Sequence, residues 1–331
     1  MGRAGVSFRR SMSRLAMAGL AIGFASMLPV HGEAQTFPEG EIHLISAFPP
    51  GSGSDVLVRF LADKLRPISG RTVIVENKPG AGGNIATQTM TRSKPNGQTI
   101  FVHPANTLAS NFHLIKNNPV DARSQVQVAA TINQQTVMLV VEAKRPWQSI
   151  AELTTYLRER GDKATYATAG SSGVIMCALY KERAKLDTVE VNYKTAPDSL
   201  NDMASGVVDF ACHDPLFALL HQREGRFRIL GIAAKDRLRA APTLPTMSEA
   251  GYSMDLSGWF AAMVPAATPR PIVDQLNTWF RQVVELDETQ KFLVNYGSDA
   301  LISTPEQGQA RLMKDIADWG EYVRIAKLTP Q

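Results

Sequence analysis

Short apolar runs typical of β-strands alternate with amphipathic runs typical of α-helices along most of this 331-residue chain. In the first half the strand-like runs lie at 41–47, 72–76 and 99–103, and the helix-like runs between them lie at 55–65 and 84–92. Because a strand, a helix and a second strand in this order form a βαβ unit, the pattern predicts a largely parallel sheet. The chain is therefore expected to be an α/β protein.

The same alternation begins again in the second half of the chain. We expect strands at 137–141, 165–167, 189–191, 207–211 and 229–233, and helices at 149–160, 173–184, 197–204, 271–285 and 305–326. A chain of this length also allows two ordinary domains. The sequence therefore predicts an α/β protein with two lobes, each with a mainly parallel sheet covered by helices on both faces.

Residues 1–34 have the pattern of a secretory signal peptide. A basic region precedes the apolar stretch 15–30, and small residues then lead to Ala34, after which we expect cleavage. The apolar stretch is short for a membrane-spanning helix, so a membrane anchor is the less favoured alternative. The residues after Arg9 and Arg10 match a twin-arginine signal poorly, which favours the general secretory route. We therefore expect a periplasmic protein.

The formal charge of +4 comes largely from this leader, because residues 1–34 contain four Arg and one acidic residue. The remainder is nearly balanced and has no run of Lys and Arg with interleaved aromatic residues, so no nucleic-acid partner is expected. An oxidising compartment permits a disulfide between Cys177 and Cys212, but two buried free thiols is the favoured interpretation. No spacing typical of a metal site occurs, and we predict no metal or cofactor.

Three glycine-rich loops each follow a predicted strand and open a predicted helix. In the first, 49–55, Ser54 is the expected N-cap, and the free N–H groups of the next turn would suit a carboxylate. Alone, this loop could equally be an ordinary capped turn. The second, 76–84, lacks the last glycine of a dinucleotide fingerprint because Ile85 stands there. It is expected to be a shaped loop lined by backbone groups.

The third loop, 168–173, repeats the design of the first loop in the second half of the chain. One such loop from each lobe could hold an anion from both sides. Neither loop contains Arg or Lys, so we expect recognition by backbone N–H groups, hydroxyl groups and water.

Weaker candidates follow three other strands: Asn106 with Thr107, the segment 193–195, and His213 with Asp214. For His213 and Asp214 ligand contact is favoured over acid–base catalysis, because adjacent residues on a turn rarely point at one another. The chain has no Gly-x-Ser-x-Gly elbow and no HExxH motif, so we predict no catalytic residue and no enzyme. An exported hydrolase is the less favoured alternative.

Taken in order, these segments resemble the Bug-type (TctC-like) extracytoplasmic solute receptors of the tripartite tricarboxylate transporter family. The segments that carry the resemblance are 47–55, 75–84, 94–97, 193–197, 206–209 and 258–260. The run Glu-Asn-Lys-Pro-Gly-Ala-Gly-Gly from Glu76 is the most specific of them. The resemblance covers essentially everything after the leader.

The resemblance implies a type II periplasmic binding protein, or Venus flytrap, whose lobes are joined by crossing strands. We expect lobe 1 to contain residues 36–135 and 256–331, and lobe 2 to contain residues 136–255. The family implies a small carboxylate ligand and delivery to membrane permease subunits, and we expect the protein to be a monomer. The ligand positions that it implies are Phe48, Gly53, Ser54, Asp55, Asn84, Thr107, Gly170, Ser171 and Ser172.

The chain departs from the family pattern in three places. Ser52 interrupts a run of glycines, Met176 stands where members commonly have His, and His213, followed by Asp214, stands where they commonly have Asp. We add Met176, His213 and Asp214 to the predicted ligand-binding residues. A His in place of an acid makes this wall less negative and titratable near neutral pH. The ligand is therefore expected to have an apolar or second anionic end, such as an aromatic or longer dicarboxylate. A receptor that presents its ligand to a sensor kinase stays an alternative to transport.

Overall fold

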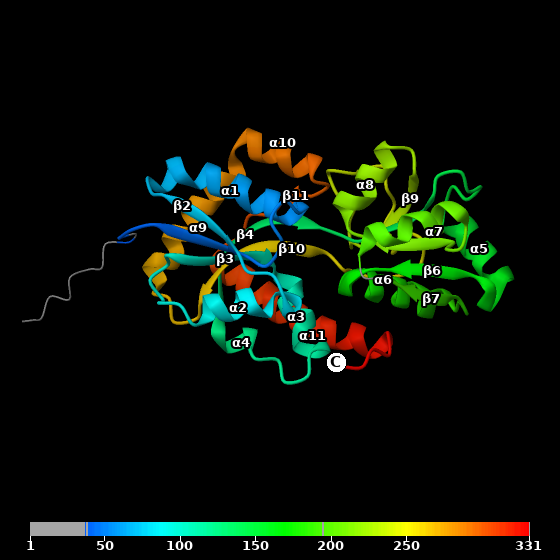
Figure 1. The fold of residues 1–331 in the computed structure, drawn as a ribbon, viewed down its shortest axis with the longest axis horizontal. Helices are drawn as coiled ribbons and strands as arrows, with labels where there is room; N and C mark the ends of the chain where they lie inside the picture. Colours follow the sequence, from blue (N-terminus) through cyan, green and yellow to red (C-terminus); the bar gives the residue numbers. More distant parts are fainter. Residues whose placement is uncertain (1–36, 38, 194, 331) are drawn as a thin grey trace, which may run out of the picture. The chain divides into compact units, whose positions relative to one another are not determined.

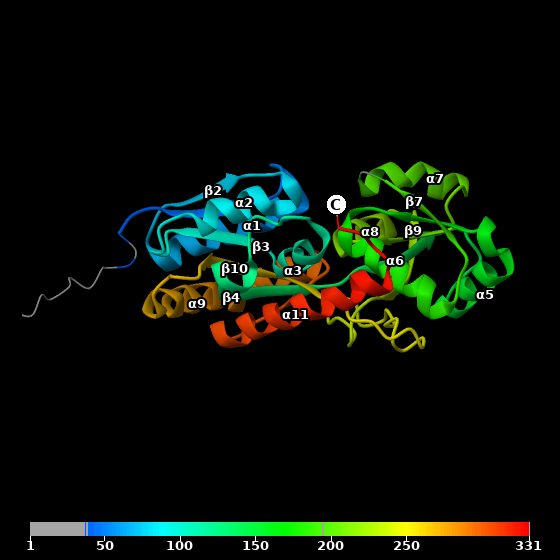
Figure 2. The same ribbon diagram turned by 90° about the horizontal axis from the view of Figure 1, so that it is seen from below.

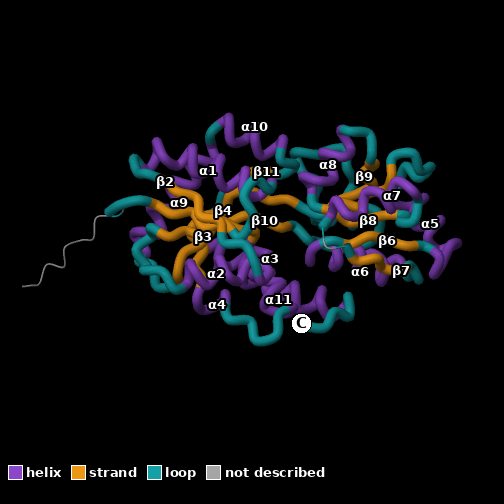
Figure 3. The backbone as a smooth tube through the Cα atoms, in the orientation of Figure 1, coloured by secondary structure: helices purple, strands orange, loops and turns teal. Residues whose placement is uncertain are grey.

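The computed structural model describes residues 37, 39–193 and 195–330, and the predicted signal peptide at 1–34 lies outside them. The side chains of residues 170 and 171 are also outside the description. The described strands form two separate sheets, which appear as two groups of orange segments in Figure 3. The structure therefore has the two-lobed α/β fold that the alternation predicts.

Six strands form the first sheet, in the order β11-β4-β10-β3-β1-β2 (Figure 1). They are β1 (Ile42–Ser46), β2 (Val73–Asn77), β3 (Thr99–Pro104), β4 (Val126–Gln135), β10 (Gly258–Pro265) and β11 (Asp299–Ala300). Strand β1 pairs in parallel with β2 and β3. Strand β10 is antiparallel to β3 and β4, and β11 is antiparallel to β4.

Five strands form the second sheet, in the order β7-β6-β8-β5-β9. They are β5 (Met138–Glu142), β6 (Thr165–Thr168), β7 (Val189–Asn192), β8 (Phe210–His213) and β9 (Phe227–Ile232). Strand β6 is parallel to β7 and β8, whereas β5 is antiparallel to β8 and β9.

Both sheets are thus mixed rather than mainly parallel. The reason lies in the two segments that connect them. Strand β4 ends at Gln135 in the first sheet and β5 begins at Met138 in the second, so no crossover helix sets the direction of β5. Strand β10 returns from the second lobe through the loop 233–257 and inserts between β3 and β4 against the direction of both.

Helices cover both faces of each sheet. The α-helices are α1 (Gly53–Ser69), α2 (Asn84–Thr91), α3 (Ala105–Leu114), α4 (Ala122–Gln125), α5 (Ile150–Arg160), α6 (Gly170–Ala184), α7 (Leu200–Ser205), α8 (Pro215–Arg223), α9 (Arg270–Glu285), α10 (Asp287–Asn295) and α11 (Pro305–Ile325). Short 3₁₀ turns are η1 (Ala81–Gly83), η2 (Gly161–Lys163) and η3 (Ala196–Ser199). In Figure 1, α1 and α9 lie on one side of the first sheet, and α2, α3 and α11 lie on the other.

The apolar faces of these helices build the core. On α1, Leu57, Leu61 and Leu65 recur at helical spacing and are fully buried with Val273 and Phe280 of α9. Burying one such side chain contributes ~1.5–3 kcal/mol, so this face fixes α1 on the first sheet. The position of α1 matters because its first turn carries the first predicted loop.

Helix α11 contacts elements of both lobes. It begins with a capping box in which Thr304 accepts a hydrogen bond from the Gln307 amide and the Gln307 side chain accepts one from the Thr304 amide. It then contacts α3 and β4 of the first lobe and α6 of the second. Figure 2 shows this long helix beneath the first sheet, extending toward α6.

Candidate functional site

The loop after β1 presents the first turn of α1. Ser52 is the N-cap, because its backbone is extended and its side chain accepts a hydrogen bond from the Asp55 amide at 3.3 Å. The prediction that Ser54 is the N-cap is therefore wrong, since the helix begins at Gly53 and Ser54 lies inside its first turn. Among the hydrogen bonds of the described residues, the amides of Gly53 and Ser54 have no acceptor.

Asp55 holds this loop in shape. Its carboxylate is almost fully buried and accepts hydrogen bonds from the Gly51 amide at 2.8 Å, Arg59 Nε at 2.8 Å and Asn77 Nδ2 at 2.7 Å. Burial favours the neutral acid, but the hydrogen bonds outweigh it and lower the pKa of Asp55. Asn77 also donates to the Phe48 carbonyl at 2.9 Å. Asp55 thus shapes the loop, and a contact of its carboxylate with ligand stays a prediction.

The second loop winds through left-handed backbone. Gly80, Ala81, Gly82 and Gly83 all have positive φ values, of 124°, 48°, 60° and 90°. A Cβ on Gly83 would lie 3.1 Å from His103 Nε2, so glycine is needed there for the close approach as well as for the backbone angle. The turn leads into α2 at Asn84, which is buried and accepts a 3.4 Å hydrogen bond from Asn111 Nδ2.

His103 lies beneath these two loops at the end of β3. Its side chain is buried, and neither ring nitrogen has a hydrogen-bond partner among the described residues. Burial lowers the pKa of His103 to about 3, so the ring is neutral. It packs against the ring of Phe48, with 4.9 Å between centroids. Phe48 is therefore placed by the core of the first lobe and is half-buried.

The third loop ends at the N-terminus of α6. The N-cap of α6 is Ala169, which has no side-chain oxygen to accept from the first-turn amides. Ser172 Oγ in that turn accepts from Asn106 Nδ2 at 3.4 Å, and Asn106 lies in the first turn of α3 beside half-buried Thr107. Asn106 is buried, and its Oδ1 has no donor among the described residues. This hydrogen bond joins the two lobes at predicted site residues.

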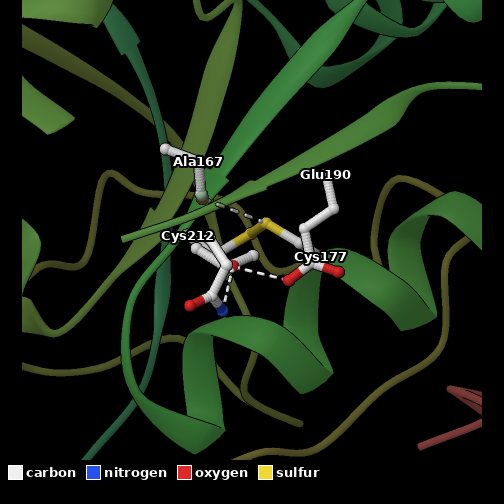
Figure 4. Close-up of a disulfide and its surroundings, with 6 residues drawn as sticks. Ala167, Cys177, Glu190 and Cys212 are labelled. Atoms are coloured by element: carbon white, nitrogen blue, oxygen red, sulfur yellow. Dashed lines mark hydrogen bonds between the residues drawn. A yellow bond between two sulfur atoms is a disulfide. The ribbon is translucent and has the colours of Figure 1, made fainter. Parts of the chain in front are cut away.

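A disulfide fastens α6 to β8. Cys177 on α6 and Cys212 on β8 are bonded, with Cα atoms 6.0 Å apart, and both are fully buried (Figure 4). The favoured interpretation of two free thiols was therefore wrong, because sequence does not show that α6 packs directly on the end of β8. A Cβ on Gly173 would lie only 2.5 Å from the Cys212 carbonyl oxygen, which shows how closely the helix approaches.

The side chain of Met176 is fully buried in the core of the second lobe. His213 ends β8 and is almost fully buried, with its Nε2 3.3 Å from Ser199 Oγ and its Nδ1 without a partner among the described residues. Burial and nearby His221 lower the pKa of His213 to about 4. The expectation that it titrates near neutral pH is therefore wrong, because its aromatic surroundings of Phe217 and Phe227 exclude water.

Asp214 follows as the N-cap of α8 and accepts from the Phe217 amide at 3.0 Å. Helix α8 contacts the first lobe where glycines leave room. A Cβ on Gly53 would overlap Leu216 Cδ2, and a Cβ on Gly297 would overlap Leu219 Cδ1. The first turns of α1 and α8 therefore adjoin one another.

The structure thus shows two contacts between the lobes at or beside predicted residues. Gly53 lies against the first turn of α8, which Asp214 caps, and Asn106, the neighbour of Thr107, donates to Ser172. Three residues near these loops were not predicted from the sequence: His103, Leu216, and Tyr296, whose Cε2 would lie 4.0 Å from a Cβ on Gly53. His103 ends a predicted strand, which is a usable signal, but nothing near Tyr296 marks it as part of a site.

A separate open pocket of about 340 Å³ lies at the starts of β1 and β3, away from these loops. It is lined by Glu41, His43, Lys94, Asn96, Gln98 and Thr99. Within the described residues no group of His, Cys, Asp or Glu could hold a metal ion, and no helix could span a membrane.

Comparison with known proteins decides the family. The model of the tripartite tricarboxylate transporter family receptor (TctC) matches residues 57–327. The chain belongs to this family. The resemblance of the loop segments is therefore confirmed. The protein BugT of Bordetella pertussis is 29% identical to this TctC-family receptor over 320 residues, covering 95% of this chain and 98% of BugT.

Two solved structures extend the comparison. Rpa4515 of R. palustris with adipate is 25% identical, with a TM-score of 0.78, covering 89% of this chain and 100% of Rpa4515. MatC (Rpa3494) from Rhodopseudomonas palustris with bound malate is 25% identical, with a TM-score of 0.72, covering 87% of this chain and 100% of MatC. These likenesses confirm the fold of a periplasmic binding protein for this TctC-family receptor.

Proposed function

We propose that this chain is a periplasmic substrate-binding protein, exported by its signal peptide, that captures a small carboxylate between its two lobes. It then delivers the ligand to the membrane permease subunits of a tripartite tricarboxylate-type transporter. The observation that carries the proposal is that the amides of Gly53 and Ser54 at the start of α1 have no acceptor among the described residues and lie beside the start of α8. The family and the adipate and malate found in relatives agree with it.

The capture mechanism uses helix N-termini instead of ion pairs. The first-turn N–H groups of α1 and α6 carry the positive ends of the helix dipoles, and neither loop contains Arg or Lys. A carboxylate bound there gives up water but gains several N–H and hydroxyl hydrogen bonds. Because the ligand would contact both lobes, it favours the conformation in which the lobes are in contact.

Among small carboxylates we propose a dicarboxylate, aromatic ones included. Two of the predicted second-lobe residues are neutral or apolar, since His213 keeps a neutral ring and Met176 is a thioether. Such a wall suits an apolar body or a second carboxylate solvated by hydrogen bonds. The residue contacts that the family implies, including Gly170 and Ser171, are part of this proposal.

A thermal-shift screen of the mature chain tests the function. We expect a subset of aliphatic and aromatic mono- and dicarboxylates, tested at millimolar concentration, to raise the melting temperature by several degrees. A ligand that binds only the folded state stabilises that state by mass action. If only monocarboxylates, α-amino acids with a single carboxylate included, raised the melting temperature, the dicarboxylate proposal would be wrong. Labelling by a fluorophosphonate probe would instead favour an exported hydrolase. Loss of ligand uptake on deletion of the receptor gene tests delivery.

A further inference from the structure

The start of α8 meets the first lobe at one corner of the candidate site. A Cβ on Gly53 would overlap Leu216, and a Cβ on Gly297 would lie 3.2 Å from the Pro215 Cβ. Asp214 directly precedes Pro215, and Ser54 directly follows Gly53. The geometry therefore places Asp214 at the same corner as the first-turn amides of α1.

No cationic side chain of the described residues pairs with the carboxylate of Asp214. Its side chain is exposed to solvent, although the surrounding protein is dense enough that burial raises its pKa. Backbone amides at the start of α8 oppose this rise, and Phe217 donates to its Oδ1. Across the part of the chain that the structure describes, no Lys, Arg or His lies within ion-pair distance of this carboxylate.

Tyr296 links this acid to the first lobe. Its ring is buried, and burial raises the pKa of its hydroxyl to about 12. A hydrogen bond with the Ser54 side chain opposes this rise, while the charge of Asp214 adds to it. Tyr296 therefore keeps its proton and lies near both Ser54 and Asp214. The corner combines N–H groups that favour an anion with a carboxylate that repels one.

A ligand whose only polar groups are carboxylates interacts favourably with the amides of this corner but not with Asp214. Its negative charge suits the amides of Gly53 and Ser54 but is repelled by Asp214. A hydroxyl or ammonium group beside the carboxylate would remove the conflict by donating to Asp214. Asn106, which is buried and reaches the second lobe, independently leaves its Oδ1 without a donor among the described residues. This Oδ1 lies 3.1 Å from where a Cβ on Gly258 would be, whereas Asp214 accepts from backbone amides only.

We propose that the ligand carries an O–H or N–H donor on the carbon next to its carboxylate, and that Asp214 accepts this donor and so determines specificity. The inference rests on the proposed function, because it assumes that the α1 amides hold a carboxylate.

Matched ligands that differ by one donor test the inference by calorimetry. Malate and aspartate are compared with succinate, and mandelate with phenylacetate. The donor-bearing member of at least one pair should bind tenfold or more tightly, which corresponds to ~1.4 kcal/mol. Equal or tighter binding of the donor-free members would overturn the inference and leave the proposed function standing. No binding of any member at millimolar concentration would overturn both.

The variant Asp214→Asn separates the charge from the helix cap, because Asn is as good an N-cap as Asp. It should reduce the preference within the pair to less than threefold while the melting temperature stays within a few degrees. The matched control is Asp121→Asn. Asp121 also caps a helix, α4, and this helix contains no predicted site residue. The control should keep the full preference. A preference that survives in Asp214→Asn would contradict the role of Asp214.

Discussion

Ser54 contributes its main-chain N–H group to the candidate site, and Ser52 supplies the cap. Because Ser52 already accepts from the Asp55 amide, the helix start does not depend on the Ser54 hydroxyl. The hydroxyl instead acts on Tyr296, whose pKa it helps to lower against the effect of burial. The amide and the hydroxyl of Ser54 therefore have separate roles, and substitutions can test them separately.

Ser54→Pro removes the amide donor at a position in the first turn, where proline is tolerated. We expect the affinity for carboxylate to fall at least tenfold in calorimetry, whereas Ser54→Ala, which keeps the amide, should weaken binding less. Ala151→Pro is the matched control, because Ala151 holds the same position in α5 and is exposed. Unchanged affinity in a folded Ser54→Pro variant would count against the first loop.

The carboxyl group of Asp315 makes the free energy of unfolding depend on pH. It accepts from Trp259 Nε1 at 2.7 Å, and burial raises its pKa to about 6 while the Trp259 hydrogen bond and Arg311 oppose the rise. The folded state thus binds this proton more tightly than the unfolded chain, whose pKa is near 3.8. The stabilisation is complete below pH ~4 and is lost as the pH rises through 6.

The variant Asp315→Asn stays neutral and can still accept from Trp259. We expect it to be more stable than the wild type by up to ~2–3 kcal/mol at pH 8, because one pKa unit corresponds to about 1.4 kcal/mol. The difference should shrink below pH 5. Urea unfolding followed by tryptophan fluorescence at several pH values measures it, and parallel pH profiles of the two proteins would refute the assignment.

At the scale of single residues, sequence reasoning succeeded where backbone chemistry is local. The glycines of the second loop were recognised, and their positive φ values explain the pattern. The N-cap was misplaced by two residues because Ser52 and Ser54 have the same side chain. They are distinguished only by the point where the backbone changes from extended to helical, which lies between Ser52 and Gly53. Tyr296 could not be found, since its role depends on a contact with residues far away in sequence.

The element that most defines the second-lobe part of the site is α6. Its first turn carries Ser172, the close contact of Gly173 with Cys212 seats that turn on β8, and the disulfide from Cys177 fixes the next turn. The same strand leads directly to His213 and Asp214. One covalent link therefore holds the two second-lobe segments together.

Replacing both cysteines by alanine should cost the folded protein ~2–4 kcal/mol, because the bond closes a loop with a sequence separation of 35 residues in the unfolded chain. Chemical denaturation of the double variant and of the wild type, with and without reductant, measures this. Ligand affinity should fall as well, since α6 and β8 are then less firmly aligned. A double variant as stable as the oxidised wild type would contradict a stabilising bond.

Sequence periodicity located most strands and helices but missed β4, β10, β11, α3, α4, α8 and α10. Strands β4 and β10 lie in the middle of the first sheet and are nearly all buried, so they lack the alternation that marks a half-exposed strand. Helix α8 begins at Pro215 directly after a strand, with no glycine-rich loop to mark it. The mixed direction of the first sheet was missed as well, because the unpredicted strand β10 runs antiparallel to both of its neighbours.

In the molecule as a whole, two crossing segments and several direct contacts join the lobes. The strands divide between the sheets at residues 135–138 and 232–258, which supports the proposed lobe limits of 36–135 with 256–331 and 136–255. Helix α8 of the second lobe contacts the first where Gly53 and Gly297 leave space for leucines.

Gly53→Ala tests this contact. The added Cβ would overlap Leu216 Cδ2, although alanine is a better helix residue than glycine, so α1 itself should not be weakened. Ligand affinity should fall about tenfold, and Leu216→Ala in the same chain should restore most of it. A double-mutant cycle in calorimetry gives the coupling between the two residues. Additive effects would show that they do not meet in the bound state.

The central claim is that amides from both lobes hold one carboxylate. A crystal structure of the mature protein with the carboxylate that most raises its melting temperature tests this directly. The account predicts that the carboxylate oxygens lie within hydrogen-bond distance of the Gly53 or Ser54 amide and of an amide in the first turn of α6. A ligand that contacts one lobe only, or that occupies the pocket beside Glu41 and Thr99, would contradict it.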